Sequence, residues 1–358
     1  MLDLQGFFRQ AVDRSASDVF FIAGMPPAYK VDGVLHREDT PPLKPEQTAE
    51  LVEKLYQLAN GRPDERLKRT GEDDFAFSVP GLSRFRANVY RQRGSLAAVI
   101  RIITFELPDP YALHIPDTVM ELSELRRGLL LVTGPAGSGK TTTLACLIDR
   151  INRTREGHIV TLEDPIEYLH RHARSIVSQR EIGADTEGYV PALRAALRQA
   201  PDVILLGEMR DYETIRTAMT AAETGHLVIS TLHTTGAVNS VDRIIDAFSP
   251  SQQGQIRIQL SMVLRAVVSQ QLVPSTDGAR PAFEIMRVNT AVANLIRDAK
   301  LHQLGGVLQA SSGEGMQTMD GDLLRLYGEG LISAENALRC SLDREQMQRR
   351  LRLSEKDG

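Results

Sequence analysis

The chain has 358 residues, of which 42% are hydrophobic and 25% are charged, and its formal net charge is −4. This length suits about two domains of ordinary size, and the composition is that of a folded globular protein. The negative net charge gives no overall attraction to nucleic acid or to anionic lipid, so nucleic acid is not an expected partner.

The sequence shows no signal for secretion, no membrane-spanning segment and no pattern of paired cysteines. The first ten residues, MLDLQGFFRQ, include Asp3 and lack the basic and apolar stretches of a secretory signal. No apolar run comes near the roughly 18 residues that span a bilayer. The two cysteines, Cys146 and Cys340, are far apart, which excludes a disulfide framework and a four-cysteine zinc site. We therefore expect two thiols in a cytosolic protein.

The first hundred residues predict a small α+β domain, which we place at 1–105. Helical spacing over 4–14 is followed by VFFIAG and AYKVDGVLH, which predict two strands and a turn at Asp32-Gly33. The segment KPEQTAELVEKLYQLA has apolar residues at helical spacing. Three later segments, DFAFSV, SRFRANVYRQRG and SLAAVIRII, are typical of antiparallel strands.

A proline-rich linker, ELPDPYALHIPD at 106–117, precedes a second domain at 118–358. There, helices alternate with the apolar runs GLLLVTG, HIVTLED, VILLGEM and HLVISTLH, as in a parallel sheet covered by helices. Residues 249–332 are expected to be mostly helical, with a glycine-rich break at QASSGEGMQ. The charged tail, 343–358, is expected to fray.

The segment after the first of these runs fits the phosphate-loop pattern GxxxxGK[ST] in full. Its glycines let backbone N–H groups point inward around phosphates, and the helix that follows adds its positive N-terminal end. Lys140 would reach the β- and γ-phosphates, and the Thr141 hydroxyl would bind Mg²⁺. The residues expected to bind ATP are Gly134, Pro135, Ala136, Gly137, Ser138, Gly139, Lys140, Thr141 and Thr142.

Two strands that follow the loop end in acidic residues. Glu208 comes after VILLG and could hold Mg²⁺ directly or through water. Glu163 and Asp164 end the run HIVTLED, and Glu163 is placed to orient and deprotonate the attacking water. A single acid in such a position is often a strand-end cap or an ion-pair partner. Two acidic strand ends after one phosphate loop favour catalysis.

Two histidines flank the apolar run LVIS. His226 and His233 are seven residues apart, and no cluster of further Cys or His residues suggests zinc. The hydroxyls of Thr231, Thr234 and Thr235 beside His233 favour a polar sensor of the γ-phosphate. Either histidine taken alone could equally be a structural residue.

Arginines crowd the end of the first domain. The cluster consists of Arg84, Arg86, Arg91, Arg93 and Arg101. In multimeric ATPases an arginine from a neighbouring subunit can neutralise charge on the transferred phosphoryl group. The cluster could supply such a group, or it could be a solvated strand face, and the residues alone do not choose among the five.

These blocks, in this order, resemble the secretion-superfamily ATPases of bacteria and, among them, the type IV pilus retraction ATPase family, PilT. GPAGSGKTTTLA is similar to the family's Walker A, TLEDPIEYLH to its Asp box, DVILLGEMRDYETI to its Walker B and TAAETGHLVISTLHTT to its His box. SRFRANVY and GMQTMD are further likenesses, so the resemblance covers nearly the whole chain.

The resemblance implies an N-terminal PAS-like α+β domain and a RecA-like P-loop ATPase domain with a helical C-terminal part. It implies a homohexamer that hydrolyses ATP, bound between the two domains of a subunit, to power pilus retraction and twitching motility. The expected partner is an inner-membrane pilus platform protein, which would hold the motor peripherally at the cytoplasmic face of that membrane. The catalytic residues would be Glu163 as general base, Glu208 as Walker B acid, Lys140, the His-box pair His226 and His233, and Arg86 and Arg101 as arginine fingers.

The sequence departs from the family at two places. Ala293 stands where the family's AIRNL segment has its arginine, and SDVF lacks the histidine of the SDLH-type segment. Both departures lie outside the phosphate site, so we expect them to bear on the partner surface and not on hydrolysis.

Three other functions are open to comparison. A pilus assembly or type II secretion ATPase typically has an additional N-terminal domain and often a four-cysteine zinc element, for which this chain is too short and has too few cysteines. A nucleic-acid translocase would need a basic channel and stacking aromatics, whereas the chain has no Trp and 5% aromatic residues. A non-hydrolysing nucleotide-binding scaffold is disfavoured by Lys140, Thr141, Glu163 and Glu208.

Overall fold

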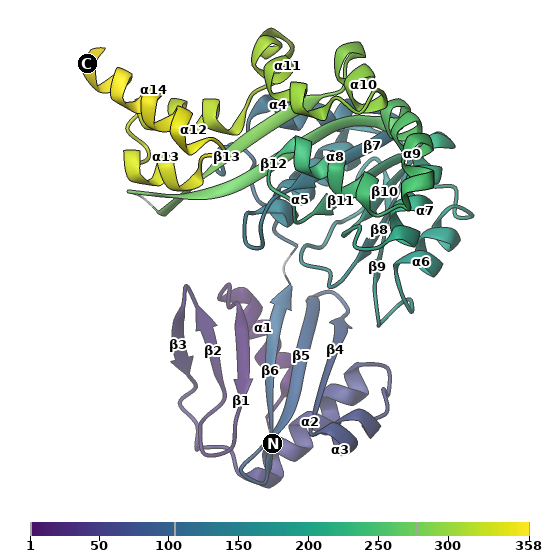
Figure 1. Cartoon of the computed structure of the whole chain (residues 1–358). Coiled ribbons are helices and arrows are strands. Elements are labelled where there is room, and N and C mark those ends of the chain that lie inside the picture. The colour runs from purple at the N-terminus through teal and green to yellow at the C-terminus, as the bar shows by residue number, and fades with distance from the viewer. Residues whose placement is uncertain (1, 104, 277, 358) are drawn as a thin grey trace. The chain divides into compact units, whose positions relative to one another are not determined.

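The computed structural model describes residues 2–103, 105–276 and 278–357, and the side chains of these residues through 353. The chain divides into two units (Figure 1). The first unit comprises Met1–Leu107 and Glu167–Leu169, and the second comprises Pro108–Ile166 and His170–Gly358.

The first unit is a six-stranded antiparallel sheet with three helices, in the order β3-β2-β1-β6-β5-β4. Its helices are α1 (Leu4–Asp13), α2 (Pro45–Leu58) and α3 (Glu65–Thr70). Its strands are β1 (Asp18–Phe21), β2 (Ala28–Val31), β3 (Val34–Arg37), β4 (Glu72–Val79), β5 (Ser83–Gln92) and β6 (Ser95–Ile103). The α+β class predicted for this region is confirmed.

The predicted turn at Asp32-Gly33 is present between β2 and β3. Both residues have positive φ, 47° and 82°, and Val31 pairs with Val34 across the turn. The prediction of two strands in this region was wrong, because the structure has three. A loop separates Phe21 from Ala28, so VFFIAG contributes to β1 alone. The turn then divides AYKVDGVLH into β2 and β3.

Aromatic side chains fill the core of the first unit. Phe8 of α1 is fully buried, and its ring centroid lies 4.6 Å from that of Phe85 in β5 and 5.8 Å from that of Phe77 in β4. Helix α1 is amphipathic and begins at Asp3, whose side chain accepts a hydrogen bond from the Gly6 N–H. The apolar face of α1 therefore packs across three strands of the sheet, because Phe8 also lies 6.4 Å from Phe21 of β1.

The second unit contains a seven-stranded sheet in the order β13-β12-β7-β11-β10-β8-β9 (Figure 1). The strands are β7 (Gly128–Thr133), β8 (His158–Glu163), β9 (Ile176–Glu181), β10 (Val203–Leu206), β11 (Leu227–Leu232), β12 (Leu264–Ser275) and β13 (Gly278–Arg287). All neighbouring pairs are parallel except β12 with β13. The parallel sheet predicted from the four apolar runs is confirmed.

Helices cover both faces of this sheet. They are α4 (Asp117–Met120), η1 (Glu121–Glu124), α5 (Lys140–Thr154), α6 (Tyr189–Ala196), α7 (Tyr212–Glu223), α8 (Ala237–Asp246), α9 (Pro250–Val263), α10 (Thr290–Arg297), η2 (Leu301–Gln303), α11 (Leu304–Ala310), η3 (Ser312–Glu314), α12 (Met319–Gly328), α13 (Ala334–Cys340) and α14 (Arg344–Asp357). Alternate residues of β7 enter two separate cores. Leu129 and Leu131 pack with α6 to α9, whereas Leu130 and Val132 pack with α5. Burial on both faces explains why β7 is apolar from Leu129 to Val132.

The predictions for the C-terminal part need two corrections. Helices make up much of residues 249–332, but β12 and β13 form a long antiparallel hairpin within them that was not predicted. Helix α9 ends at Val263 and β12 starts at Leu264, so no turn residue marks the change. The tail forms α14 instead of fraying, because Met347 and Leu351 are 0% and 4% exposed in a core shared with α12 and α13.

Among the described residues, no helix is both long and apolar enough to cross a bilayer. Cys146 and Cys340 are free thiols.

Replacing Phe8 with Ala removes the ring at the centre of the first unit's aromatic core. We expect Phe8→Ala to lower the free energy of unfolding by about 3–5 kcal/mol, the usual loss for a buried phenylalanine. Val34, which is 58% exposed on β3, provides the control, and Val34→Ala should change stability by less than about 0.5 kcal/mol. Chemical denaturation of the full chain measures both. Equal stability of the two variants would contradict the packing described for α1.

Candidate active site

The phosphate loop joins the end of β7 to the start of α5. Three of its glycines have left-handed backbone conformations, with φ of 144° at Gly134, 75° at Gly137 and 87° at Gly139. A Cβ atom on Gly134 would lie 2.2 Å from the backbone oxygen of Gln270, and one on Gly139 would lie 2.8 Å from Nε2 of Gln270. The loop therefore needs glycine for its conformation and for the close approach of β12. Helix α5, 15 residues long, directs its N-terminal N–H groups toward the loop.

Lys140 lies at the start of α5 and is 9% exposed. Its ammonium group donates hydrogen bonds to the carbonyl oxygens of Gly134, at 2.8 Å, and Pro135, at 2.9 Å. A cation held inside the loop is well placed to meet an anion that the loop's N–H groups surround.

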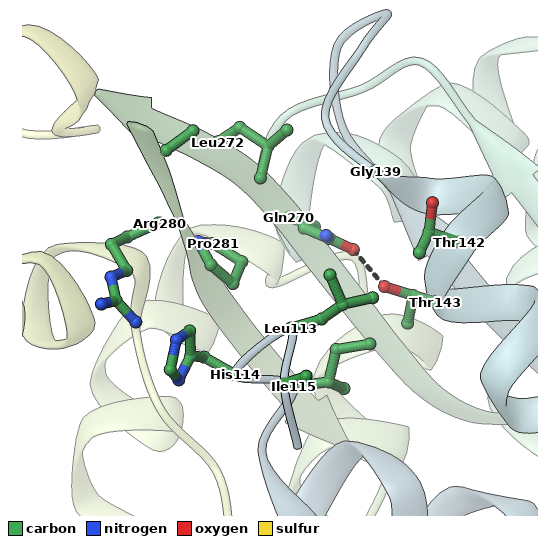
Figure 2. Close-up of a pocket in the computed structure, with 12 residues that line it drawn as sticks. Leu113, His114, Ile115, Gly139, Thr142, Thr143, Gln270, Leu272, Arg280 and Pro281 are labelled. Atoms are coloured by element: carbon green, nitrogen blue, oxygen red, sulfur yellow. Dashed lines mark hydrogen bonds between the residues drawn. The ribbon is translucent and has the colours of Figure 1, made fainter. Parts of the chain in front are cut away.

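Gln270 of β12 supports the loop, and our sequence analysis missed it. Its Oε1 accepts a hydrogen bond of 2.7 Å from the Thr143 hydroxyl in the first turn of α5, and both residues are buried (Figure 2). Strand β12 pairs with β7, so Gln270 follows the strand end at which the loop begins. Because this region was expected to be helical, no pattern placed Gln270 at the loop.

A cavity of about 360 Å³ lies beside the first turn of α5 (Figure 2). Thr142 and Thr143 line it from α5, Gln270 and Leu272 from β12, and Pro281 from β13. A further set of lining residues comes from the segment expected to be a linker: Ala112, Leu113, His114 and Ile115. The lining has about as much polar as apolar surface, and the volume is usual for a small-molecule site.

The two predicted carboxylates lie at neighbouring strand ends. Glu163 ends β8, and Glu208 follows β10 by two residues. The strands are parallel and in register at Leu162 and Leu206, and the Gly207 N–H donates to the Leu162 oxygen at 2.8 Å. Parallel pairing thus brings both acids to the edge at which β7 releases the phosphate loop. Each acid is 8% exposed.

Hydrogen bonds and ion pairs hold these acids. Glu163 Oε1 accepts from the Thr161 hydroxyl at 2.6 Å and from the Gln179 amide at 3.2 Å. Glu208 Oε1 lies 2.5 Å from the Arg210 guanidinium, and its Oε2 lies 3.4 Å from Nε2 of His233. The hydrogen bond to Glu208 raises the pKa of Arg210 above its ordinary value.

Tyr189, at the start of α6, is a second residue that the sequence analysis missed. A Cβ atom on Gly207 would lie 2.8 Å from the Tyr189 hydroxyl, so the glycine makes room for the tyrosine. Burial raises the pKa of Tyr189, and the nearby charge of Glu208 raises it further. The phenol is therefore a neutral hydrogen-bond donor beside two buried acids.

The structure separates the two predicted histidines. His233 follows the carboxyl end of β11 and contacts Glu208, whereas His226 precedes the amino end of the same strand. The six residues of β11 span about 20 Å at roughly 3.3 Å each. The Nδ1 atom of His226 lies 3.0 Å from the Ala221 oxygen, and its own carbonyl accepts from Gly128 at the start of β7. Within the second unit, His226 is therefore at the edge of the sheet opposite the loop.

The predicted arginine fingers belong to the first unit. Arg86 of β5 and Arg101 of β6 are direct partners in the antiparallel register. The Arg101 side chain is 70% exposed, and its Nε lies 3.1 Å from Oδ1 of Asp18 in β1. The two side chains thus leave the same face of the sheet from adjacent strands.

The donor set near the loop suits a magnesium ion. Among the described residues, Oε2 of Glu208 and the Ser138 hydroxyl are buried polar atoms without a hydrogen-bond partner. Carboxylate and hydroxyl oxygens are the protein ligands that Mg²⁺ prefers, and it keeps several waters besides. Oε2 of Glu208 therefore fits this ion, and the role of Thr141 stays a prediction.

The fold and the loop define an α/β nucleotide-binding protein of the P-loop class. Residues 3–307 match the family described as Type II/IV secretion system protein, and the chain belongs to this family. Within it, the chain is similar to the Pseudomonas aeruginosa type IV pilus retraction ATPase PilT, at 44% identity over 94% of this chain and 97% of the relative. It is 40% identical to PilU of the same organism, over 94% of this chain and 88% of the relative.

Solved structures agree with this placement. A crystal structure of the pilus retraction motor PilT with bound ADP matches with a TM-score of 0.87 and 46% identity, covering 98% of this chain and 100% of that one. The Legionella pneumophila ATPase DotB matches with a TM-score of 0.78 and 26% identity, over 93% of each chain. The chain is a PilT-like ATPase in sequence and in fold.

Alanine at Gly134 tests the loop geometry. We expect Gly134→Ala to weaken ATP binding at least roughly tenfold more than Gly137→Ala does, since only the first places a Cβ atom against the β12 backbone. At Gly137 nothing lies within 4 Å of the added atom, so that variant meets backbone strain of about 1–2 kcal/mol alone. Titration with a fluorescent ATP analogue gives both affinities. Equal affinities would contradict the close approach of Gln270.

Proposed function

We propose that this protein is a hexameric motor that hydrolyses ATP to power retraction of type IV pili. The observation that carries the proposal is the meeting of a complete phosphate loop with two buried acids at neighbouring strand ends. The similarity to PilT over nearly the full length of both chains supports the choice of pilus retraction.

In this mechanism the loop N–H groups and Lys140 bind the β- and γ-phosphates. Glu163 orients the attacking water and accepts its proton as general base. Thr141 and Glu208 would hold Mg²⁺, which would supply positive charge to neutralise the phosphates. His233 reports the state of the γ-phosphate to Glu208, with which it is in contact.

The cavity beside α5 is proposed to hold the nucleoside. It begins at Gly139 and Thr142, next to the phosphates, and continues between β12, β13 and residues 112–115. Leu113, Leu272 and Pro281 offer apolar surface for the faces of a base (Figure 2). This volume is within the usual range for small-molecule sites.

Arg86 and Arg101 are proposed as the cations that neutralise charge on the transferred phosphoryl group. Their adjacent positions on β5 and β6 favour joint action. Such an arginine can come from another domain or from a neighbouring subunit, and the second route requires the homohexamer. His226 lies at the sheet edge opposite its own subunit's loop, so its proposed catalytic role would also depend on the assembled hexamer.

The motor is proposed to act on an inner-membrane pilus platform protein at the cytoplasmic face of that membrane, with which it associates peripherally. Ala293, half-buried on α10, stands where the PilT family's AIRNL segment has arginine. The platform contact is therefore where this chain is expected to differ from its relatives.

Glu163→Gln tests the catalytic assignment. The amide keeps the shape of the side chain but cannot accept a proton, so turnover should fall by a factor of roughly 10² or more while ATP binding is retained. Steady-state phosphate release and nucleotide titration measure the two quantities. Turnover equal to that of the wild type would remove Glu163 from the role of base.

Arg101→Ala tests the shared site. We expect lower turnover in the assembled hexamer without unfolding, because the lost guanidinium acts on the phosphoryl group and not on packing. Arg69→Ala, at an exposed position of α3, is the control and should leave turnover unchanged. Turnover and particle size are measured on the same samples across a concentration series. A monomer with wild-type specific activity would contradict an arginine supplied through assembly.

A further inference from the structure

Glu163 is held by two donors that come from two different strands. Thr161 lies two residues earlier on β8, so its side chain is on the same face of the sheet as that of Glu163. Gln179 of β9 is the direct partner of Thr161 in the parallel register. The pairing of β8 with β9 therefore places one hydroxyl and one amide beside the carboxylate.

Both hydrogen bonds end on the same oxygen of the carboxylate. The Thr161 hydroxyl donates to Oε1 of Glu163 at 2.6 Å, and Nε2 of Gln179 donates to the same atom at 3.2 Å. Two donors on one oxygen fix the rotation of the carboxylate about its last bond. The other oxygen, Oε2, is thereby held in one direction.

Gln179 is fixed in turn by the backbone. Its Oε1 accepts a hydrogen bond of 2.8 Å from the His170 N–H. This contact decides which end of the amide faces Glu163, because the carbonyl end is already engaged. Gln179 thus presents its NH₂ group to the carboxylate.

A second buried acid lies opposite Glu163 on the neighbouring strand. Glu181 is the direct partner of Glu163 in the register of β8 and β9, and it is 7% exposed. Like charges that are directly opposite in a sheet repel each other. Donors that hold Glu163 in one orientation counter such repulsion.

We propose that Thr161 and Gln179 are positioning residues that aim Glu163 at the attacking water. The proposal rests on the proposed function, in which Glu163 is the general base. The two donors bind Oε1 of the carboxylate, and this fixes the direction in which Oε2 points. A base held in this way needs no reorientation when the water attacks the γ-phosphate.

Thr161→Val tests the proposal, because it removes the hydroxyl and keeps the shape of the buried side chain. We expect kcat to fall roughly 10- to 100-fold, with the Kd for ATP unchanged, as is usual for a misplaced catalytic group. Thr161→Ser retains the hydroxyl and should restore most of kcat. Gln179→Leu should lower kcat in the same way and serves as the second variant if Thr161→Val is poorly folded.

A buried threonine outside the site provides the matched control. Thr48 of α2 is fully buried, and its hydroxyl donates to the Pro45 oxygen at 3.0 Å. Thr48→Val should leave kcat unchanged, which shows that losing a buried hydroxyl is not itself the cause.

A double-mutant cycle shows whether the two donors act through Glu163. In the Glu163→Gln background, Thr161→Val should cause no further fall in kcat. An equal fall in both backgrounds, or wild-type kcat in both Thr161→Val and Gln179→Leu, would overturn the proposal. Wild-type turnover of Glu163→Gln alone would instead refute the base assignment, so the two failures are distinguishable.

Discussion

The parallel pairing of β7, β8, β10 and β11 is the constraint on which the rest of this site depends. In a parallel sheet all carboxyl ends meet at one edge, so the phosphate loop, Glu163, Glu208 and His233 converge although some 100 residues separate the first from the last. The two helical layers then follow, because such strands are buried on both faces and need cover on each. The parallel pairing of the strands thus accounts both for the position of the site residues and for the helical layers.

Burying two carboxylates at this edge is costly, since each ion loses water. The structure offsets the cost locally. Glu208 has an arginine on one oxygen and a histidine near the other, and Glu163 has a hydroxyl and an amide. Hydrogen bonds and ion pairs thus replace part of the water that each acid loses on burial.

The sequence predicted the parts of the fold that have strong local patterns. Four apolar runs, the phosphate loop and the acids after the strands were identified because each lies within one short segment. Gln270 was missed because its strand follows α9 directly and carries Ser269, Gln270 and Gln271 within an apolar run. The run between His226 and His233 was predicted as a strand, and the extended length of that strand places the two histidines at opposite edges of the sheet. The partners Tyr189 and Gln179 come from elements distant in sequence, and spacing carries no information about them.

Lys140 limits the free energy that the loop gains on binding a nucleotide. Its ammonium is already hydrogen-bonded to the carbonyls of Gly134 and Pro135. A phosphate that takes this cation therefore exchanges one set of hydrogen bonds for another, each worth about 1.5–3 kcal/mol when one partner is charged. The contribution of Lys140 to nucleotide affinity is then the free energy of its bonds to phosphate minus that of its bonds to the two carbonyl groups. Because this difference is small, Lys140 does not hold the product tightly, and a motor must release product in each cycle.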